Sequence, residues 1–280
     1  MSEGWQWDES LFRGSASHYT RGRLPYAPGL LDRLVAELEL DGHGRLLDVG
    51  CGPGTLTLML APYFDEAVGV DPDPDMLAEA ERRCTEAGIG NARWVRARAE
   101  ELPGGIEACN VALFGQSFHW MDRARVAVIV YGMLEPGGAF VHVSDIKEDC
   151  PREEIDLPYP GTPYGNIQAL MRSYLGPVRR AGQGVLRYGT PDIEWGVLQD
   201  AGFINFQAVR VPGGGKVVRE VDDVIAWVWS RSDSAPHLFG DQIERFETEL
   251  RQLLADASPS GFFAERLPDT EVFVWRTPQS

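Results

Sequence analysis

The sequence predicts an α/β protein with a doubly wound, mainly parallel, seven-stranded sheet. Short apolar runs alternate with segments of helical spacing through the first half of the chain, which is typical of parallel strands covered by helices on both faces. A glycine cluster separates the first apolar run from the next helical segment, as expected of a βαβ unit. Two further apolar runs near the C-terminus supply the last strands.

Each element of the first half follows from a local pattern. Residues 29–40 carry apolar side chains at helical spacing, and Asp41-Gly-His-Gly44 ends that helix. The turn Glu135-Pro-Gly-Gly138 stops a later helix and leads into the fifth strand. The strands expected here are 45–50, 67–71, 92–96, 110–114 and 139–144, and the helices are 55–60, 74–87 and 124–134.

The second half begins with a break in this rhythm. From Lys147 to about Thr190 a stretch rich in Pro, Tyr and Gly surrounds one helical segment, 166–174, and predicts a cap inserted after the fifth strand. Strands at 203–211 and 271–276 would form a pair that completes the sheet. The helices expected after the cap are 192–201, 221–230 and 241–257.

Composition limits the kinds of partner that the protein is expected to bind. A formal net charge of −16 over 280 residues repels phosphate backbones and anionic lipid, so we expect neither nucleic acid nor membrane as a partner. The four cysteines form no C-x-x-C pair and no His stands at ligand spacing, so no metal site is expected. The N-terminus lacks the pattern of a secretory leader. We therefore expect a cytoplasmic protein, and assembly into a homo-oligomer is compatible with this composition.

The strongest motif is the loop Asp48-Val-Gly50-Cys-Gly52-Pro-Gly54-Thr55 between a strand and a helix. Glycines allow a close approach to a ligand, and the helix N-terminus offers unpaired N–H groups. A dinucleotide fingerprint would need a third glycine where Thr55 stands. A carboxylate at Asp48 would repel a pyrophosphate but would suit a cation such as the ammonium of a methionine moiety, directly or through water. A bare strand-to-helix turn is the structural alternative.

Asp71 ends the second strand about twenty residues after the glycines. An acid at this point can accept hydrogen bonds from both ribose hydroxyls of an adenosine. Alone it could equally cap the helix that follows. Together with the loop, it favours a nucleoside-containing ligand.

These motifs resemble those of a known family. The sequence reads D-x-G-C-G-P-G, then V-D, A-E-x-L-P, F-H-W and L-x-P-G-G, and in this it resembles class I S-adenosylmethionine-dependent methyltransferases. It is most similar to the small-molecule branch that includes trans-aconitate and natural-product methyltransferases. The likeness is good from about Tyr19 to Asp145 and weaker beyond. It implies the Rossmann-like methyltransferase fold.

The resemblance implies roles for particular residues in cofactor binding. Many relatives carry Asp where this chain has Arg98, so the residue that contacts the adenine stays open. The alternatives to a role in cofactor binding are a solvated charge for Glu100 and core packing for Met76. The positions implied are Gly50, Gly52 and Gly54 under the methionine part with Asp48 behind them, Asp71 at the ribose, Pro72 and Met76 beside the adenine, Ala99 and Glu100 at its edge, and Gln116 with Ser117 near the methionine amino group.

Relatives also use the N-terminal segment as a lid over the cofactor. Tyr19 and Arg23 lie in this aromatic and basic stretch, and the face of Tyr19 would attract the methyl-bearing sulfonium cation. The alternative is ordinary packing of an N-terminal arm. The implied division of the chain is lid 1–28, cofactor-binding core 29–146, cap 147–190, and a C-terminal part 191–280 that completes the sheet.

His119 and Tyr19 are the catalytic candidates. His119 follows the fourth strand at the edge where open α/β sheets bind ligands, and its imidazole could take a proton from the acceptor. The alternative is a structural histidine beside Trp120, because alignment alone can drive methyl transfer.

The function expected is transfer of the methyl group of S-adenosylmethionine to an O, N or C atom of a small molecule, such as a secondary metabolite in natural-product biosynthesis. S-adenosylhomocysteine would be the other product, and no metal would be needed. Two alternative functions are considered. One is a nicotinamide-dependent oxidoreductase, which Asp48 and the missing third glycine disfavour. The other is a non-catalytic S-adenosylmethionine-binding protein.

Overall fold

The main sheet is the organising element of the chain. The computed structural model describes residues 8–146, 157–177 and 194–279. Within these residues the main sheet has seven strands in the order β3-β2-β1-β4-β5-β9-β6. Strands β1 to β5 pair in parallel, and β9 runs antiparallel to both β5 and β6, so the predicted fold class is confirmed. The bounds are β1 Arg45–Val49, β2 Glu66–Asp71, β3 Ala92–Arg96, β4 Cys109–Gly115, β5 Leu134–Asp145, β6 Ile204–Val211 and β9 Thr270–Arg276.

Helices cover both faces of this sheet. On one face α5 and α7 contribute apolar side chains such as Val130 and Leu198 to a core that includes Phe114 and Phe140 of the sheet. On the other face α2 and α3 pack against the sheet, and helix α4 lies on β2 and β3. These helices are α2 Leu30–Leu38, α3 Thr55–Leu60, α4 Pro74–Ala87, α5 Arg123–Met133 and α7 Glu194–Asp200.

The strand order reverses between β1 and β4, since β1 leads to β2 on one side and pairs with β4 on the other. Connections leave such a point in opposite directions, which opens a crevice beyond the carboxyl ends of the strands. The glycine loop follows β1, Asp71 ends β2, and Gln116 follows β4. The switch point therefore places the predicted motifs at one edge of the sheet.

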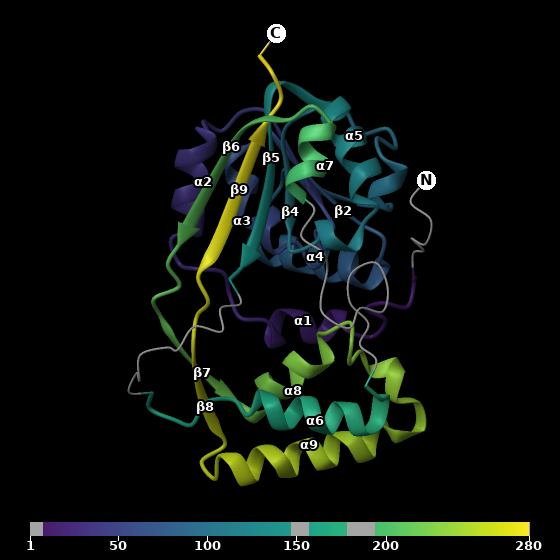
Figure 1. Cartoon of the computed structure of the whole chain (residues 1–280), viewed down its shortest axis with the longest axis vertical. Coiled ribbons are helices and arrows are strands. Elements are labelled where there is room, and N and C mark those ends of the chain that lie inside the picture. The colour runs from purple at the N-terminus through teal and green to yellow at the C-terminus, as the bar shows by residue number, and fades with distance from the viewer. Residues whose placement is uncertain (1–7, 147–156, 178–193, 280) are drawn as a thin grey trace.

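A second layer of helices lies beyond that edge (Figure 1). Its core contains Ile167, Trp229, Phe239 and Phe246, so the aromatic residues of the C-terminal helices are core residues. A two-stranded antiparallel sheet, β7 with β8, borders it. We refer to residues 157–177 and 216–266 as the helical layer. Its elements are α6 Tyr164–Leu175, β7 Lys216–Glu220, α8 Val221–Trp229, α9 Ile243–Ala257 and β8 Phe262–Arg266.

The helical layer does not follow the expected division of the chain. Helix α6 comes from the stretch 147–190 expected as a cap, yet its Ile167 and Met171 share one core with Phe246 and Phe263 from the expected C-terminal part. Two parts of that stretch, 147–156 and 178–190, lie outside the described residues. The four-part division stays a prediction, and the packing favours grouping α6 with residues 216–266.

The N-terminal segment contains a helix that the apolar pattern did not predict, α1 Ala16–Gly22. It lies between the sheet and α8 and packs mainly on α8 (Figure 1). In the described part of the chain, no helix combines the length and the apolar character that spanning a bilayer requires.

Candidate functional site

The glycine loop is held by backbone bonds and by close packing. The N–H groups of Gly50 and Cys51 both donate to the carbonyl of Val70, at 2.7 and 3.0 Å. Gly50 and Gly54 have φ values of +71° and +72°, where side chains other than glycine are strained. A Cβ on Gly50 would lie 2.6 Å from Cβ of Ser117, and one on Gly54 would lie 2.5 Å from the Trp94 ring. These two glycines are therefore required by their protein neighbours.

Gly52 differs from the other two glycines of the loop. Its φ is +53°, yet a Cβ placed on it would meet no protein atom within 4 Å. Gly52 also lines the cavity described below. The space beside this residue is thus open on the side where a ligand would approach.

Asp71 is oriented by two backbone bonds. Its carboxylate accepts hydrogen bonds from the N–H groups of Gly52 and Asp73, both at 2.9 Å, and the residue is only 9% exposed. Burial raises the pKa of this carboxyl to about 6. The bonds fix the carboxylate against the loop, and its remaining acceptor capacity faces the cavity that it lines.

Asp48 is buried behind the loop. Its carboxylate accepts a hydrogen bond from Oγ1 of Thr57 at 2.6 Å, and burial raises its pKa to about 7. The residue is 1% exposed and does not line the cavity. Its expected contact with a ligand ammonium stays a prediction, and the geometry shows Asp48 holding the first turn of α3.

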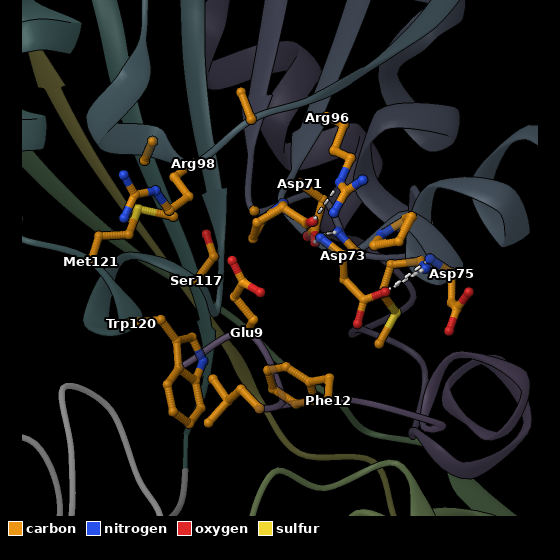
Figure 2. Close-up of a pocket in the computed structure, with 18 of the residues that line it drawn as sticks. Glu9, Phe12, Asp71, Asp73, Asp75, Arg96, Arg98, Ser117, Trp120 and Met121 are labelled. Atoms are coloured by element: carbon orange, nitrogen blue, oxygen red, sulfur yellow. Dashed lines mark hydrogen bonds between the residues drawn. The ribbon is translucent and has the colours of Figure 1, made fainter. Parts of the chain in front are cut away.

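A cavity of about 450 Å³ lies at the carboxyl edge of the sheet, between the glycine loop, the start of α4 and the N-terminal segment (Figure 2). This volume is within the usual range for small-molecule sites. Of the predicted site residues, those that line it are Tyr19, Gly50, Gly52, Asp71, Pro72, Met76, Ala99, Glu100, Gln116 and Ser117. Arg23, Asp48, Gly54 and His119 lie outside the lining.

The residues after β4 are fixed by side-chain bonds. Gln116 has a φ of +52°, and its amide Nε2 donates to the carboxylate of Asp145 at 2.6 Å. Ser117 donates from Oγ to the carbonyl of Val49 at 2.6 Å. These bonds tie the ends of β4, β5 and β1 together on the side of the cavity formed by Gln116 and Ser117.

Glu100 is a buried carboxylate rather than a solvated surface charge. It is 4% exposed and accepts a hydrogen bond from the N–H of Asp122 at 2.8 Å. The backbone carbonyl of Glu100 accepts from Arg125 at 2.9 Å. Glu100 thus joins the loop after β3 to the start of α5 while it also lines the cavity.

The two catalytic candidates lie differently with respect to the cavity. Tyr19, on α1, lines it, and the guanidinium of Arg23 lies 4.8 Å from the centre of the Tyr19 ring. His119 lies in a short 3-10 helix, Phe118–Trp120, with its ring 4.9 Å from that of Trp120. It is Trp120 that lines the cavity. This arrangement favours a structural part for His119, and its action as a base stays a prediction.

Several residues of the site were not predicted. Glu9 and Phe12 from the N-terminal segment line the cavity, and the Phe12 ring meets Trp120 edge to face at 5.6 Å (Figure 2). Asp73 and Arg96 line it as well. Phe12 belongs, with Tyr19 and Arg23, to the aromatic and basic stretch 12–26 of the N-terminal segment, but the other three become recognisable only when distant segments meet.

The lining carries more negative than positive charge. It contains six carboxylates and three guanidinium groups, and one of the latter, Arg98, is paired with Glu101 at 2.9 Å. Figure 2 shows Asp71, Asp73 and Asp75 along one side of the cavity. Such a surface suits a ligand with positive charge.

The matching family model and the similar curated proteins are methyltransferases. The family described as "Methyltransferase domain" matches residues 46–138. An uncharacterized methyltransferase of Mycobacterium bovis is 31% identical over 188 residues, which cover 61% of this chain and 74% of the relative. A trans-aconitate 2-methyltransferase of Mycobacterium ulcerans is 27% identical over 139 residues, 49% of this chain and 47% of the relative.

Solved structures show the same fold. The YcgJ protein of Bacillus subtilis superposes with a TM-score of 0.53 at 16% identity, covering 89% of this chain and 98% of the other. The N-methyltransferase NodS from Bradyrhizobium japonicum, solved with S-adenosylhomocysteine, gives a TM-score of 0.52 at 15% identity, covering 97% and 98%.

Proposed function

Because this chain belongs to the class I S-adenosylmethionine-dependent methyltransferases, we propose that the cavity at the switch point holds the cofactor and that the acceptor is a small molecule. The observation that carries the proposal is the cavity itself. It joins the glycine loop, the carboxylate that ends β2 and the segment after β4 in one space, at the place where open α/β sheets bind ligands.

The described residues fit the cofactor. Gly52 leaves free space where a side chain would block a close approach. Asp71 has acceptor capacity for ribose hydroxyls beyond its two backbone bonds. Pro72, Met76 and Ala99 would supply apolar surface for the adenine, and Gln116 with Ser117 would lie near the methionine part.

The chemistry follows from the cofactor class and from the enclosure of the site. Bound S-adenosylmethionine would supply a methyl group on a sulfonium sulfur, and the acceptor atom would take that carbon as the carbon–sulfur bond breaks. S-adenosylhomocysteine leaves, and the acceptor loses a proton where it carries one. Tyr19, Phe12 and Trp120 would exclude water and orient the acceptor. His119 would act as the base only if it turned towards this space.

The negative charge of the protein supports a small-molecule acceptor over nucleic acid, and a cytoplasmic location is part of the same proposal. A formal net charge of −16 opposes contact with a phosphate backbone. The N-terminal segment contributes Glu9 and Phe12 to the lining of the cavity, and the cavity volume of about 450 Å³ suits a compact acceptor. A secondary metabolite remains our proposal for its class.

A methyl-transfer screen tests the acceptor. Protein, S-adenosylmethionine labelled on the methyl group, and panels of amines, phenols, carboxylic acids, RNA and DNA are incubated, and label in each product is counted. We expect label in one small-molecule class and none in nucleic acid. Transfer to RNA or DNA alone would overturn the small-molecule proposal.

Gly52→Ala tests whether the open space beside the loop is used by the cofactor. We expect the dissociation constant for S-adenosylhomocysteine to rise about tenfold or more, because the new methyl group fills a space that the ligand needs. Gly88→Ala is the matched control, since Gly88 has φ +66° and equally open surroundings but ends α4 away from the cavity. Both variants should lose a similar folding free energy of about 1 kcal/mol from the left-handed backbone. Equal ligand affinity in the two variants would contradict the assignment.

The affinity for the cofactor should depend on pH. Burial raises the pKa of Asp71 to about 6 and that of Asp48 to about 7. Ionising these two groups therefore lowers the free energy of unfolding. This destabilisation is absent below their ordinary pKa near 3.8 and complete above pH 7. Since the ribose needs an ionised Asp71, we expect binding to weaken about tenfold for each pH unit below 6. Calorimetry between pH 5 and 8 measures this, and Asp71→Asn should flatten the curve; a slope unchanged in that variant would exclude Asp71 as its source.

A further inference from the structure

Helix α1 is attached to the helical layer rather than to the sheet. Gly22, its last residue, lies against α8 so closely that a Cβ there would be 2.5 Å from the Trp227 nitrogen and would overlap the Ala226 carbonyl. Its one described hydrogen bond to α4 joins the exposed side chains of Thr20 and Glu79 at 3.3 Å. A bond of that length and exposure contributes little.

Arg219 makes a buried polar contact between this helix and the helical layer, beside the half-exposed ion pair of Arg21 on α1 with Asp223 at 2.6 Å. The Arg219 side chain is 3% exposed. One terminal nitrogen, Nη2, donates to the carbonyl of Gly22 at 2.8 Å and to that of Asp223 at 2.6 Å. The other, Nη1, donates to the Glu265 carboxylate at 3.2 Å. Arg219 thus satisfies the last carbonyl of α1 and one in the first turn of α8 at once.

Glu265 fixes Arg219 in this position. Its carboxylate also accepts hydrogen bonds from the Thr162 hydroxyl at 2.5 Å and from the Tyr164 hydroxyl. These partners come from the start of α6, while Arg219 comes from β7 and Glu265 from β8. A guanidinium with its donors aimed by a buried carboxylate is pre-organised for the carbonyl that it holds.

A second contact holds α1 at the other end of α8. Arg23 follows α1 and donates from Nη2 to the carbonyl of Ser230 at 2.8 Å. Its guanidinium also lies over the Tyr19 ring. Gly22 is three residues, about one helical turn, beyond Tyr19. The position of Tyr19 in the cavity is therefore set by contacts with both ends of α8.

We propose that Arg219 is a positioning residue for the cofactor cavity: by binding the Gly22 carbonyl it holds α1, and with it Tyr19, over the site. The proposal rests on the function proposed above for that cavity. It makes the N-terminal segment a lid that the helical layer carries, so an event that loosens the Arg219–Glu265 pair also loosens the cover of the cofactor. Arg219 itself does not line the cavity.

The test separates positioning from support of the fold. In Arg219→Met/Glu265→Gln both charges are gone. The glutamine carbonyl can accept from one of the hydroxyls of Thr162 and Tyr164, and its amide can donate to the other, so both hydroxyls keep a partner. We expect amide hydrogen exchange in residues 16–23 of the ligand-free protein to accelerate, and S-adenosylhomocysteine to dissociate about tenfold faster in stopped flow. Arg219→Lys should recover part of both effects, since it keeps a cation beside Glu265 without the fork of donors.

Two further variants complete the design. Arg245→Met removes an exposed arginine of α9 that pairs with Glu249 of the same helix and should change neither readout. Gly22→Ala displaces α1 without altering any charge. It should accelerate amide exchange at 16–23 and ligand release as the double variant does, and it keeps the test available if the double variant does not fold. Unchanged exchange at 16–23 and unchanged ligand release in Arg219→Met/Glu265→Gln, or in Gly22→Ala where the double variant does not fold, would overturn the proposal. Failure of the wild-type protein to bind the ligand would instead count against the proposed function, and the exchange measurement would still decide how α1 is held.

Discussion

Replacing Asp71 by alanine is expected to weaken S-adenosylmethionine binding by about 2 to 3 kcal/mol, or about 30- to 150-fold, because a charged acceptor of two hydroxyl bonds is lost. The Asp71 carboxylate also accepts hydrogen bonds from the N–H groups of Gly52 and Asp73. Part of the loss would therefore come from a looser loop. Titration calorimetry at pH 8, where Asp71 is ionised in the free protein, measures the whole effect.

Asp75→Ala provides the control for Asp71. Asp75 also lines the cavity, but it is exposed on the first turn of α4, so its removal should change the affinity by less than about 0.5 kcal/mol. Asp71→Asn keeps the shape of the side chain and should bind with intermediate affinity. Equal dissociation constants for Asp71→Ala and Asp75→Ala would remove the ribose assignment.

Glu265→Ala is expected to lower the free energy of unfolding by about 3 to 5 kcal/mol, because it leaves the Arg219 guanidinium buried without its carboxylate. The two side chains are 3% and 9% exposed. The hydroxyls of Thr162 and Tyr164 lose their acceptor in the same variant. Denaturant unfolding followed by far-ultraviolet circular dichroism measures the loss.

The exposed pair between Arg251 and Asp222, 2.8 Å apart with both side chains about half exposed, is the comparison. Breaking it by Arg251→Met should cost less than about 1 kcal/mol. Arg219→Met/Glu265→Gln should be more stable than Glu265→Ala, since no charge is left unpaired. A Glu265→Ala protein as stable as Arg251→Met would show that the buried pair contributes no more to stability than an exposed one.

The sheet could be predicted because its strands are local patterns. Each parallel strand is a short apolar run bounded by a turn, and the alternation with helices specifies the class without knowledge of contacts. Strands β7 and β8 were missed, since Lys216–Glu220 and Phe262–Arg266 pair across more than 40 residues of chain. Helix α1 was missed because its seven residues include only two buried ones, Ala16 and Gly22, so packing on α8 stabilises it rather than its own periodicity.

The residues of the site also fall into those that chain order predicts and those that depend on contacts between distant segments. Gly50, Gly52, Asp71 and Gln116 lie at or just after the ends of strands whose carboxyl ends meet at the switch point. Their place in the cavity could therefore be expected from chain order. The contribution of the N-terminal segment to the cavity was harder to predict from the sequence. Glu9 reaches the cavity only because the chain folds back over the sheet edge.

His119 shows the limit of reasoning from neighbours in sequence. Ser117 and Trp120 line the cavity, and the histidine between them does not. A short 3-10 helix turns successive side chains in different directions. Chain position alone could not decide which of the three would face the ligand.

Titration calorimetry of the wild-type protein with S-adenosylhomocysteine, beside NADH, at pH 8 tests the central claim most directly. We predict one site per chain for S-adenosylhomocysteine, with hydrogen-exchange protection at residues 50–54, 71–76 and 115–117, and no binding of NADH. Binding of NADH without S-adenosylhomocysteine, or protection confined to residues away from these three segments, would contradict the account.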